Sequence, residues 1–412
     1  MTGSSVSNPA IDRDPGRWRM LALLSIAELL GMSLWFAASA VAPQLARSWS
    51  LTRTEVAWLT TIVQLGFVCG TATAALLNLA DVLPSRWYFA VAALIGASAN
   101  AGLVASSGFA TALTLRFITG FSLAGVYPPA MKMASTWFRA RRGLAIGTVV
   151  GALTVGKATP YLVHALPNAG PALVILTASG CAIVAALLVA TGYSDGPYPF
   201  PPRRFSWRLV GTVFGQREWR LATGGYLGHM FELYSFWTWI PLFLAASVAA
   251  EGIAASTRVD ASVSLVAFGT IAIGGIGCVW GGLVADRRGR ERLVVAAMAL
   301  SGSCALVIPF AFGRSLWILG PIAWAWGFFV IADSAQFSAL VTESVPPHAV
   351  GTALTVQTSL GFLLTMVSIQ LVPPLVALVG WKWVFPILAF GPAFGIAAIR
   401  RLAIARRALV LT

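Results

Sequence analysis

Long apolar runs alternate with short polar segments along almost the whole chain. About 20 consecutive apolar residues cross the hydrocarbon core of a bilayer as a helix, so apolar runs of about 18 or more predict spanning helices. The sequence contains twelve such runs, at residues 19–45, 55–80, 87–106, 109–135, 143–165, 170–192, 220–248, 260–284, 292–312, 315–341, 351–378 and 383–404. We therefore predict an all-α integral membrane protein with twelve transmembrane helices.

The one long polar stretch between apolar runs lies near the midpoint of the chain. It is rich in proline and arginine, and it separates the sixth run from the seventh. It therefore divides the runs into two sets of six. We expect an N-terminal tail, a six-helix bundle, a linker, a second six-helix bundle and a C-terminal tail, at residues 1–18, 19–193, 194–219, 220–404 and 405–412.

Two features recur at nearly the same offset and predict that the two halves are copies of one unit. Asp81 and Asp286 lie in similar acidic loops, 205 residues apart. Glu28 and Glu232 lie 204 residues apart, and each precedes a Trp by seven residues. In a membrane protein, a duplication of this size is the architecture of transporters that open alternately to the two sides. The two bundles should therefore be pseudo-symmetric.

Composition and charge distribution agree with a membrane protein. The chain is 58% hydrophobic and only 10% charged, whereas a soluble domain has about 25% charged residues. With the N-terminus placed inside, 20 Lys and Arg residues fall on the inner side and five on the outer side. This bias predicts that both termini are cytoplasmic and that the protein lies in the plasma (inner) membrane. It also accounts for the net charge of +14 without a nucleic-acid partner.

The sequence contains no pattern typical of an enzyme. The four cysteines fall within apolar runs without the spacing of a metal site, at Cys69, Cys181, Cys278 and Cys304. No phosphate-binding loop is present, so we do not expect ATP to drive transport from this chain. We expect no enzymatic activity, no cofactor and no bound metal.

Three sequence motifs resemble those of the major facilitator superfamily. Residues 282–292 read GLVADRRGRER and are similar to the family's loop G-x-L-A-D-R-x-G-R-K, and residues 77–86 (LNLADVLPSR) are a reduced copy. Residues 116–120 read RFITG, and residues 137–143 read WFRARRG, both typical of the family's fourth span and the loop after it. The resemblance implies two six-helix bundles that carry out secondary transport.

The resemblance also implies a cytoplasmic gate. A carboxylate at the end of one helix can stabilise the positive N-terminus of a neighbouring helix and pair with nearby arginines. We expect such a latch between the halves, strongest between Asp286 and either Arg287 or Arg290, with Asp81 and Arg86 as the weaker copy. The alternative is a helical turn whose charges only set the topology.

Ionisable side chains inside apolar runs are functional candidates because an isolated charge in the bilayer is costly. Glu28, Glu232, Asp333 and Lys157 come from different runs but share a similar depth. A carboxylate in an apolar site has a raised tendency to hold a proton, which a proton-coupled carrier needs. We therefore assign Glu28, Glu232 and Asp333 to proton coupling, with His229 one turn before Glu232 as a further candidate. The alternative is a static set of ion pairs that orients the helices.

A second group of residues is assigned to solute binding. Lys157 interrupts a glycine-rich run and needs a counter-ion, which is either Glu28 or an anionic substrate. Arg116 is a second cation, although the resemblance implies a proton-relay or helix-contact role for it. Aromatic and amide side chains complete the candidate site, at Trp35, Tyr234, Gln336 and Gln357. His164, near an outer helix end, is given no role.

These features predict a secondary transporter that moves a small solute by alternating access, coupled to protons. Lys157 and Arg116 favour a small organic or inorganic anion as the substrate. The alternative is a proton-driven exporter of apolar or cationic drugs, in which the carboxylates would recognise the cation. We expect the solute, protons and the lipid bilayer as partners and a functional monomer.

Overall fold

The computed structural model describes residues 14–139, 141–198, 206–254 and 256–411. Within these ranges, the side chains of residues 80, 81, 142 and 408–411 are outside the description. The described residues form helices joined by short turns, and no strand occurs among them. The predicted all-α class is therefore confirmed for this part of the chain.

The first half of the chain consists of the helices that precede the polar midpoint stretch. Their bounds are α1 Gly16–Gly31, η1 Met32–Leu34, α2 Ala37–Ala40, α3 Ala42–Trp49, α4 Arg53–Leu76, α5 Leu79–Val82, α6 Ser85–Gly102, η2 Leu103–Ala105, α7 Phe109–Leu123, α8 Tyr127–Ser135, α9 Arg142–His164 and α10 Pro171–Gly192.

The second half follows that stretch. Its elements are α11 Trp207–Gly215, α12 Arg217–Ala250, α13 Thr257–Ala272, α14 Gly274–Arg288, α15 Arg290–Val307, η3 Ile308–Ala311, α16 Leu316–Ala332, α17 Ser334–Glu343, η4 Pro347–Ala349, α18 Val350–Val384, η5 Phe385–Ala389 and α19 Phe390–Leu411.

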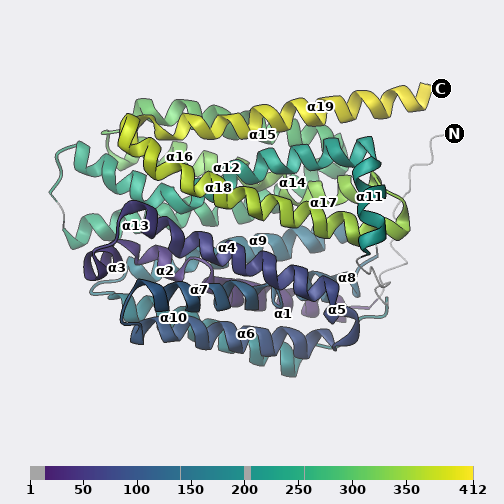
Figure 1. Cartoon of the computed structure of the whole chain (residues 1–412), viewed down its shortest axis with the longest axis horizontal. Coiled ribbons are helices and arrows are strands. Elements are labelled where there is room, and N and C mark those ends of the chain that lie inside the picture. The colour runs from purple at the N-terminus through teal and green to yellow at the C-terminus, as the bar shows by residue number, and fades with distance from the viewer. Residues whose placement is uncertain (1–13, 140, 199–205, 255, 412) are drawn as a thin grey trace.

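The long helices run along one common direction, with the first half on one side of the molecule and the second half on the other (Figure 1). Helices α4 and α9 of the first half contact α18, α13 and α14 of the second half. We call the end of the molecule that carries α2, α3 and α13 the α3 end, and the opposite end, with α5, α8 and α11, the α5 end. These helices therefore form most of the contact between the two halves.

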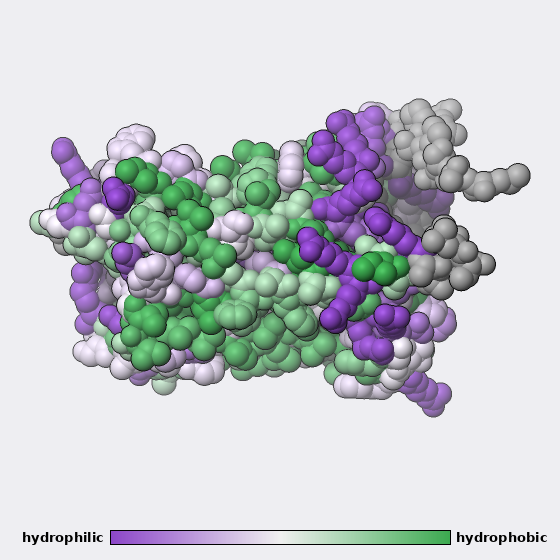
Figure 2. Space-filling view, turned by 90° about the horizontal axis from the view of Figure 1, so that it is seen from above, coloured by the Kyte–Doolittle hydropathy of each residue, from purple (hydrophilic) through white to green (hydrophobic). Residues whose placement is uncertain are grey.

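The surface has the distribution of a membrane protein. Apolar side chains cover the middle of the molecule, and hydrophilic side chains gather toward its two ends (Figure 2). Large apolar side chains are exposed on the surface, for example Leu187, Phe310 and Ile276, which are 56%, 69% and 66% exposed. Such a large apolar surface has no favourable partner in water and fits lipid.

Ten helices among the described residues are long and apolar enough to cross a membrane. The last of them, Pro347–Arg407, has 61 residues, about three times the length of one crossing. It contains a break at Gly380, whose φ of +73° lies in the region that favours glycine. The predicted eleventh and twelfth runs, 351–378 and 383–404, lie on either side of this break.

The predicted first run, 19–45, is not one continuous helix. It is divided into α1, the 3₁₀ helix η1, α2 and α3. The break leaves backbone carbonyls of Leu34 and Trp35 without helical partners, and the Arg116 guanidinium donates hydrogen bonds to both. A backbone break at membrane depth is tolerated where protein groups satisfy it, and Arg116 does so here.

Helix α9 packs closely against helices of both halves. Gly151 of α9 and Gly275 of α14 face each other, so a Cβ on Gly151 would lie 2.8 Å from the Gly275 carbonyl oxygen. One turn further along α9, a Cβ on Gly156 would lie 2.1 Å from the carbonyl oxygen of Leu29 in α1. Small residues allow this close approach of helices in membranes. Lys157, the next residue, is thereby fixed beside α1.

Gly156→Ala should lower the thermal unfolding temperature of the detergent-purified protein. The added methyl group has no space beside the Leu29 carbonyl, and overpacking costs about 1–3 kcal/mol. The matched control is Gly180→Ala in α10, where nothing lies within 4 Å of the added carbon. Equal unfolding temperatures for the two variants would contradict the close contact between α9 and α1.

Candidate functional site

Lys157 lies in a cage of aromatic side chains where the two halves meet. Its ammonium donates a hydrogen bond of 2.6 Å to the Tyr234 hydroxyl. It lies 4.4 Å from the ring centre of Trp35, 4.8 Å from that of Tyr234 and 5.5 Å from that of Trp237. The side chain is 3% exposed. These rings stabilise the cation through their negative faces.

Glu28 is the acidic neighbour of this cage. It belongs to the buried stripe of α1 and is 0% exposed, and neither of its carboxylate oxygens has a hydrogen-bond partner among the described residues. It attracts Lys157 electrostatically, but the two do not form a direct ion pair. From the sequence, the counter-ion of Lys157 is expected to be either Glu28 or an anionic substrate. Glu28 is near Lys157 but does not contact it directly.

Further aromatic side chains from both halves pack against the rings of the cage. Trp35 of the first half packs against Phe67 at 5.3 Å and against Phe362 of α18 at 5.9 Å between ring centres. Phe362 also contacts Tyr234 at 5.3 Å. Trp35 and Tyr234, both predicted for the solute site, therefore lie together with Lys157.

Glu232, the sequence counterpart of Glu28, has a different environment. Its carboxylate accepts a hydrogen bond of 2.7 Å from the indole of Trp326 and one of 2.9 Å from the Ser301 hydroxyl. All three residues belong to the second half, in α12, α16 and α15. Glu232 is 1% exposed. The two glutamates thus differ: Glu232 accepts hydrogen bonds from two donors, and Glu28 has no donor among the described residues.

His229 and Asp333 form a pair near the centre of the second half. The His229 Nδ1 atom lies 2.9 Å from a carboxylate oxygen of Asp333, and both side chains are nearly inaccessible. Asp333 lies at the junction between α16 and α17, where the helix is interrupted. It interacts electrostatically with Glu232 and with Cys278, and Cys278 interacts with Lys157. The predicted proton-coupling residues therefore occupy one region, although Asp333 contacts His229 rather than Glu28 or Lys157.

Three predicted solute-binding residues lie outside the cage. Arg116 is 0% exposed and directs its guanidinium nitrogens at the carbonyls of Leu34, Trp35 and Leu59. Its described donors bond to carbonyls at the helix break and in α4 and not to the cage, and its assignment to the solute stays a prediction. Gln336 and Gln357 are buried, but no described hydrogen bond joins either to Lys157.

The first copy of the predicted gate is only partly described. The side chain of Asp81 lies outside the described residues. Arg86 is exposed and its guanidinium packs 5.3 Å from the ring centre of the adjacent Trp87. The predicted latch between Asp81 and Arg86 stays a prediction.

The second copy of the gate differs from the prediction. The Asp286 carboxylate lies beside Gly143 in the first turn of α9, 3.6 Å from where a Cβ would be. It therefore reaches the N-terminus of a helix in the other half, where a negative charge is favourable. No ion pair of Asp286 with Arg287 or Arg290 occurs among the described residues, and Arg290 pairs with Glu343 instead.

A larger charge network holds the second half together near the α5 end. The Arg406 guanidinium of α19 donates to Glu218 at 3.0 Å, to Glu291 at 2.8 Å and to Glu343 at 3.3 Å. These carboxylates come from α12, α15 and α17, so one arginine joins four helices. Sequence reasoning missed this network because its members lie 63 to 188 residues from Arg406.

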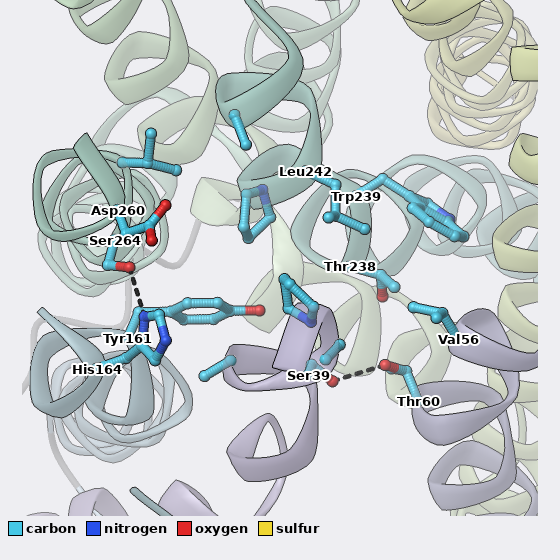
Figure 3. Close-up of a pocket in the computed structure, with 16 residues that line it drawn as sticks. Ser39, Val56, Thr60, Tyr161, His164, Thr238, Trp239, Leu242, Asp260 and Ser264 are labelled. Carbon is cyan, nitrogen blue, oxygen red and sulfur yellow. Dashed lines mark hydrogen bonds between the residues drawn. The ribbon is translucent and has the colours of Figure 1, made fainter. Parts of the chain in front are cut away.

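A pocket at the α3 end was also missed. It lies between the two halves and has a volume of about 80 Å³. Side chains from α2, α3, α4, α9, α12 and α13 line it, and several of them are polar (Figure 3). Tyr161 and His164 of α9 reach it from the helix that also carries Lys157.

The profile of the Major Facilitator Superfamily matches residues 23–369. The chain belongs to this superfamily. The protein is therefore a membrane transporter and not an enzyme. No curated protein matches the chain by sequence.

Solved transporters of the superfamily share the fold. The crystal structure of a point mutant of the nucleoside transporter NupG aligns with a TM-score of 0.70, over 93% of this chain and 99% of the NupG chain. The sequence identity is 14%, so the similarity shows the fold alone and does not indicate what this protein transports.

Replacing both donors to Glu232, in the double variant Ser301→Ala and Trp326→Phe, should destabilise the purified protein. A buried carboxylate without its donors costs about 1–3 kcal/mol or more for each lost partner. Thermal unfolding in detergent measures the effect. Ser303→Ala is the control, since Ser303 is an exposed residue of the same helix that bonds only to the Ala299 carbonyl. A double variant as stable as this control would show that Glu232 does not depend on these donors.

Proposed function

We propose that this protein is a proton-coupled secondary transporter of a small organic or inorganic anion, which binds Lys157 between the two halves. The transporter would have twelve spanning helices in two pseudo-symmetric six-helix bundles, at residues 19–193 and 220–404. The protein would lie in the plasma membrane with both termini in the cytoplasm. A monomer would suffice for transport.

Three features support twelve crossings. Ten membrane-length helices are described, and the 61-residue helix among them is divided at Gly380 into two parts. The first apolar run supplies another crossing, interrupted at η1, which is why its helices are individually short. The linker at residues 194–219 and the tails at 1–18 and 405–412 would then lie on the cytoplasmic side, where 20 of the Lys and Arg residues fall.

The observation that carries the substrate assignment is the Lys157 ammonium, which is buried without a direct ionic partner. Its one described hydrogen bond goes to a neutral hydroxyl, that of Tyr234. A buried ammonium is stabilised most by an anion in direct contact. The aromatic rings support the charge in the absence of the solute, and an anionic solute would supply the missing contact.

Glu28 is the preferred proton-coupling residue. Its carboxylate has no hydrogen-bond donor and lies close enough to Lys157 for electrostatic attraction. An anion on Lys157 would repel an ionised Glu28, so binding of the solute and of a proton to Glu28 favour each other. This reciprocity is the thermodynamic basis of coupling.

The alternating-access cycle would start from the state with the α5 end closed. At this end, the Asp286 carboxylate lies at the α9 N-terminus of the other half, and nearer the middle of α9 the close contact between Gly151 and Gly275 also brings the halves together. At the α3 end, the pocket lies between the halves. Rocking of one half against the other would then open the α5 end and expose Lys157 to the cytoplasm.

A second candidate function is favoured by the cage itself. Three aromatic rings within 5.5 Å of one ammonium are the recognition geometry of organic cations. In an exporter of cationic drugs, the substrate would displace Lys157 from the rings, with Glu28 as the cation's partner.

Lys157→Met distinguishes the two functions. We expect small anions such as nitrate, formate and lactate to raise the unfolding temperature of the unmodified protein and to lose this effect in the variant. A ligand at 100 times its dissociation constant stabilises by about 2.7 kcal/mol, which a thermal-shift assay detects.

Lys382→Met is the matched control for this assay, because Lys382 is an exposed lysine that also lies over a tryptophan ring. Anion stabilisation should survive in it. If organic cations stabilise the protein, and more strongly in Lys157→Met, the emptied cage binds cations and the anion assignment is wrong.

Glu28→Gln should abolish anion uptake driven by a pH gradient in proteoliposomes and keep the exchange of anion across the membrane. The amide cannot take up a proton, whereas exchange needs no net proton movement. The anion found in the thermal-shift assay is the substrate to measure.

The parallel variant Glu232→Gln shows whether the second copy shares this role. Because Trp326 and Ser301 hold Glu232 inside one half, we expect Glu232→Gln to retain pH-driven uptake. Uptake that still follows the pH gradient in Glu28→Gln would remove Glu28 from the coupling mechanism.

A further inference from the structure

The pocket at the α3 end contains a histidine that bridges the two halves. His164 is the last residue of α9, and its Nδ1 atom lies 2.8 Å from the Ser264 hydroxyl of α13 in the other half. Its Nε2 atom lies 2.6 Å from the side-chain nitrogen of Gln44 in α3. Figure 3 shows the contact with Ser264 at the side of the pocket. His164 therefore joins α3, α9 and α13.

Both neighbours of His164 can serve either protonation state of its ring. In the described arrangement, Gln44 donates to Nε2 and leaves its own carbonyl oxygen without a partner. Rotating that amide would present the oxygen to a protonated Nε2, and the Ser264 oxygen can accept from Nδ1. An imidazolium, which has two donors, is thus satisfied by the same two residues.

Burial disfavours a charged ring at His164, and a nearby negative charge opposes this effect. Asp260 of α13 is the one charged side chain among the described residues that line the pocket. It interacts electrostatically with His164. The other described neighbours are uncharged. Gln44 and Ser264 contact the ring, and hydroxyl, aromatic and aliphatic side chains come from α2, α3, α4, α9, α12 and α13. A proton on His164 would therefore meet a carboxylate and no opposing cation within the lining.

The pocket is suited to water. Its volume is about 80 Å³, and one water molecule needs only about 10–15 Å³ on this measure. The Tyr161 hydroxyl reaches into the pocket, is buried in a side chain that is 2% exposed, and has no hydrogen-bond partner among the described residues (Figure 3). A buried hydroxyl that points into a polar cavity is satisfied by water.

The helix α9 connects this pocket with the Lys157 cage. Lys157, Tyr161 and His164 are spaced by four and three residues and so lie on one face of α9. Likewise, Thr238 of the pocket follows Tyr234 of the cage by one turn of α12. The pocket therefore lies one to two helical turns from Lys157, toward the α3 end.

We propose that this pocket is the proton-binding site of the transporter at the α3 end, and that His164 takes up the proton. The inference rests on the proposed proton coupling and adds a residue and an entry point to it. One proton passes from hydronium in the pocket to Nε2 of His164, the ring nitrogen that accepts from Gln44, and leaves water and an imidazolium. The Gln44 amide rotates so that its oxygen accepts from the new N–H, and no covalent bond other than those of the proton changes. The imidazolium, held by Gln44, Ser264 and Asp260, keeps the two halves joined at this end.

Histidine-selective ¹⁵N NMR of the full-length protein in detergent tests the proposal without knowledge of the substrate. The chain has three histidines, so the variants His164→Gln, His229→Gln and His348→Gln assign the signals. We expect the ring nitrogens of His164 to change from neutral to doubly protonated between about pH 8 and about pH 5, the range in which histidine switches. In Asp260→Asn, the change should require a more acidic solution, because the stabilising negative charge is gone.

The exposed His348 near the α5 end is the internal control, and Asp260→Asn should leave its titration unchanged. The proposal is overturned if His164 keeps one protonation state over the whole range, or if Asp260→Asn does not alter its titration. The outcome also separates this site from the coupling residue. If His164 titrates as expected while Glu28→Gln retains pH-driven uptake, the proton site stands and the role of Glu28 fails.

Discussion

A buried ammonium needs compensating interactions, and the ammonium of Lys157 lies where helices of both halves meet. Neither lipid nor the apolar helix surfaces supply an ionic partner, so three aromatic rings and the Tyr234 hydroxyl surround it. These groups come from both halves of the chain. The groups that stabilise the Lys157 ammonium are therefore complete only when the two halves are in contact.

The two glutamates that the sequence pattern pairs, Glu28 and Glu232, have different environments. Glu232 is bound by Trp326 and Ser301 within one half, whereas Glu28 has no donor and lies beside Lys157 at the contact between halves. A carboxylate enclosed by donors favours one rigid arrangement, and a carboxylate without donors responds to its surroundings. The similar sequence positions of Glu28 and Glu232 therefore do not give them similar surroundings.

Helix breaks place polar groups deep in the protein. The break at η1 exposes the carbonyls of Leu34 and Trp35, and Arg116 satisfies them. The interruption between α16 and α17 places Asp333 against His229. In both cases the polar group is enclosed by protein, as a membrane interior requires.

The sequence by itself determined the membrane class, the approximate positions of the spanning helices, the superfamily and the set of buried charges, because hydrophobic runs and local motifs are properties of neighbouring residues. It also grouped Lys157 with Trp35 and Tyr234, which the structure places in contact. Only the tertiary structure decided that Arg116 serves the backbone, that Arg290 pairs with Glu343, and that His164 joins the halves. These partners are up to about 100 residues apart in the chain. Which partner a charge acquires depends on how helices pack, and no local pattern records that packing.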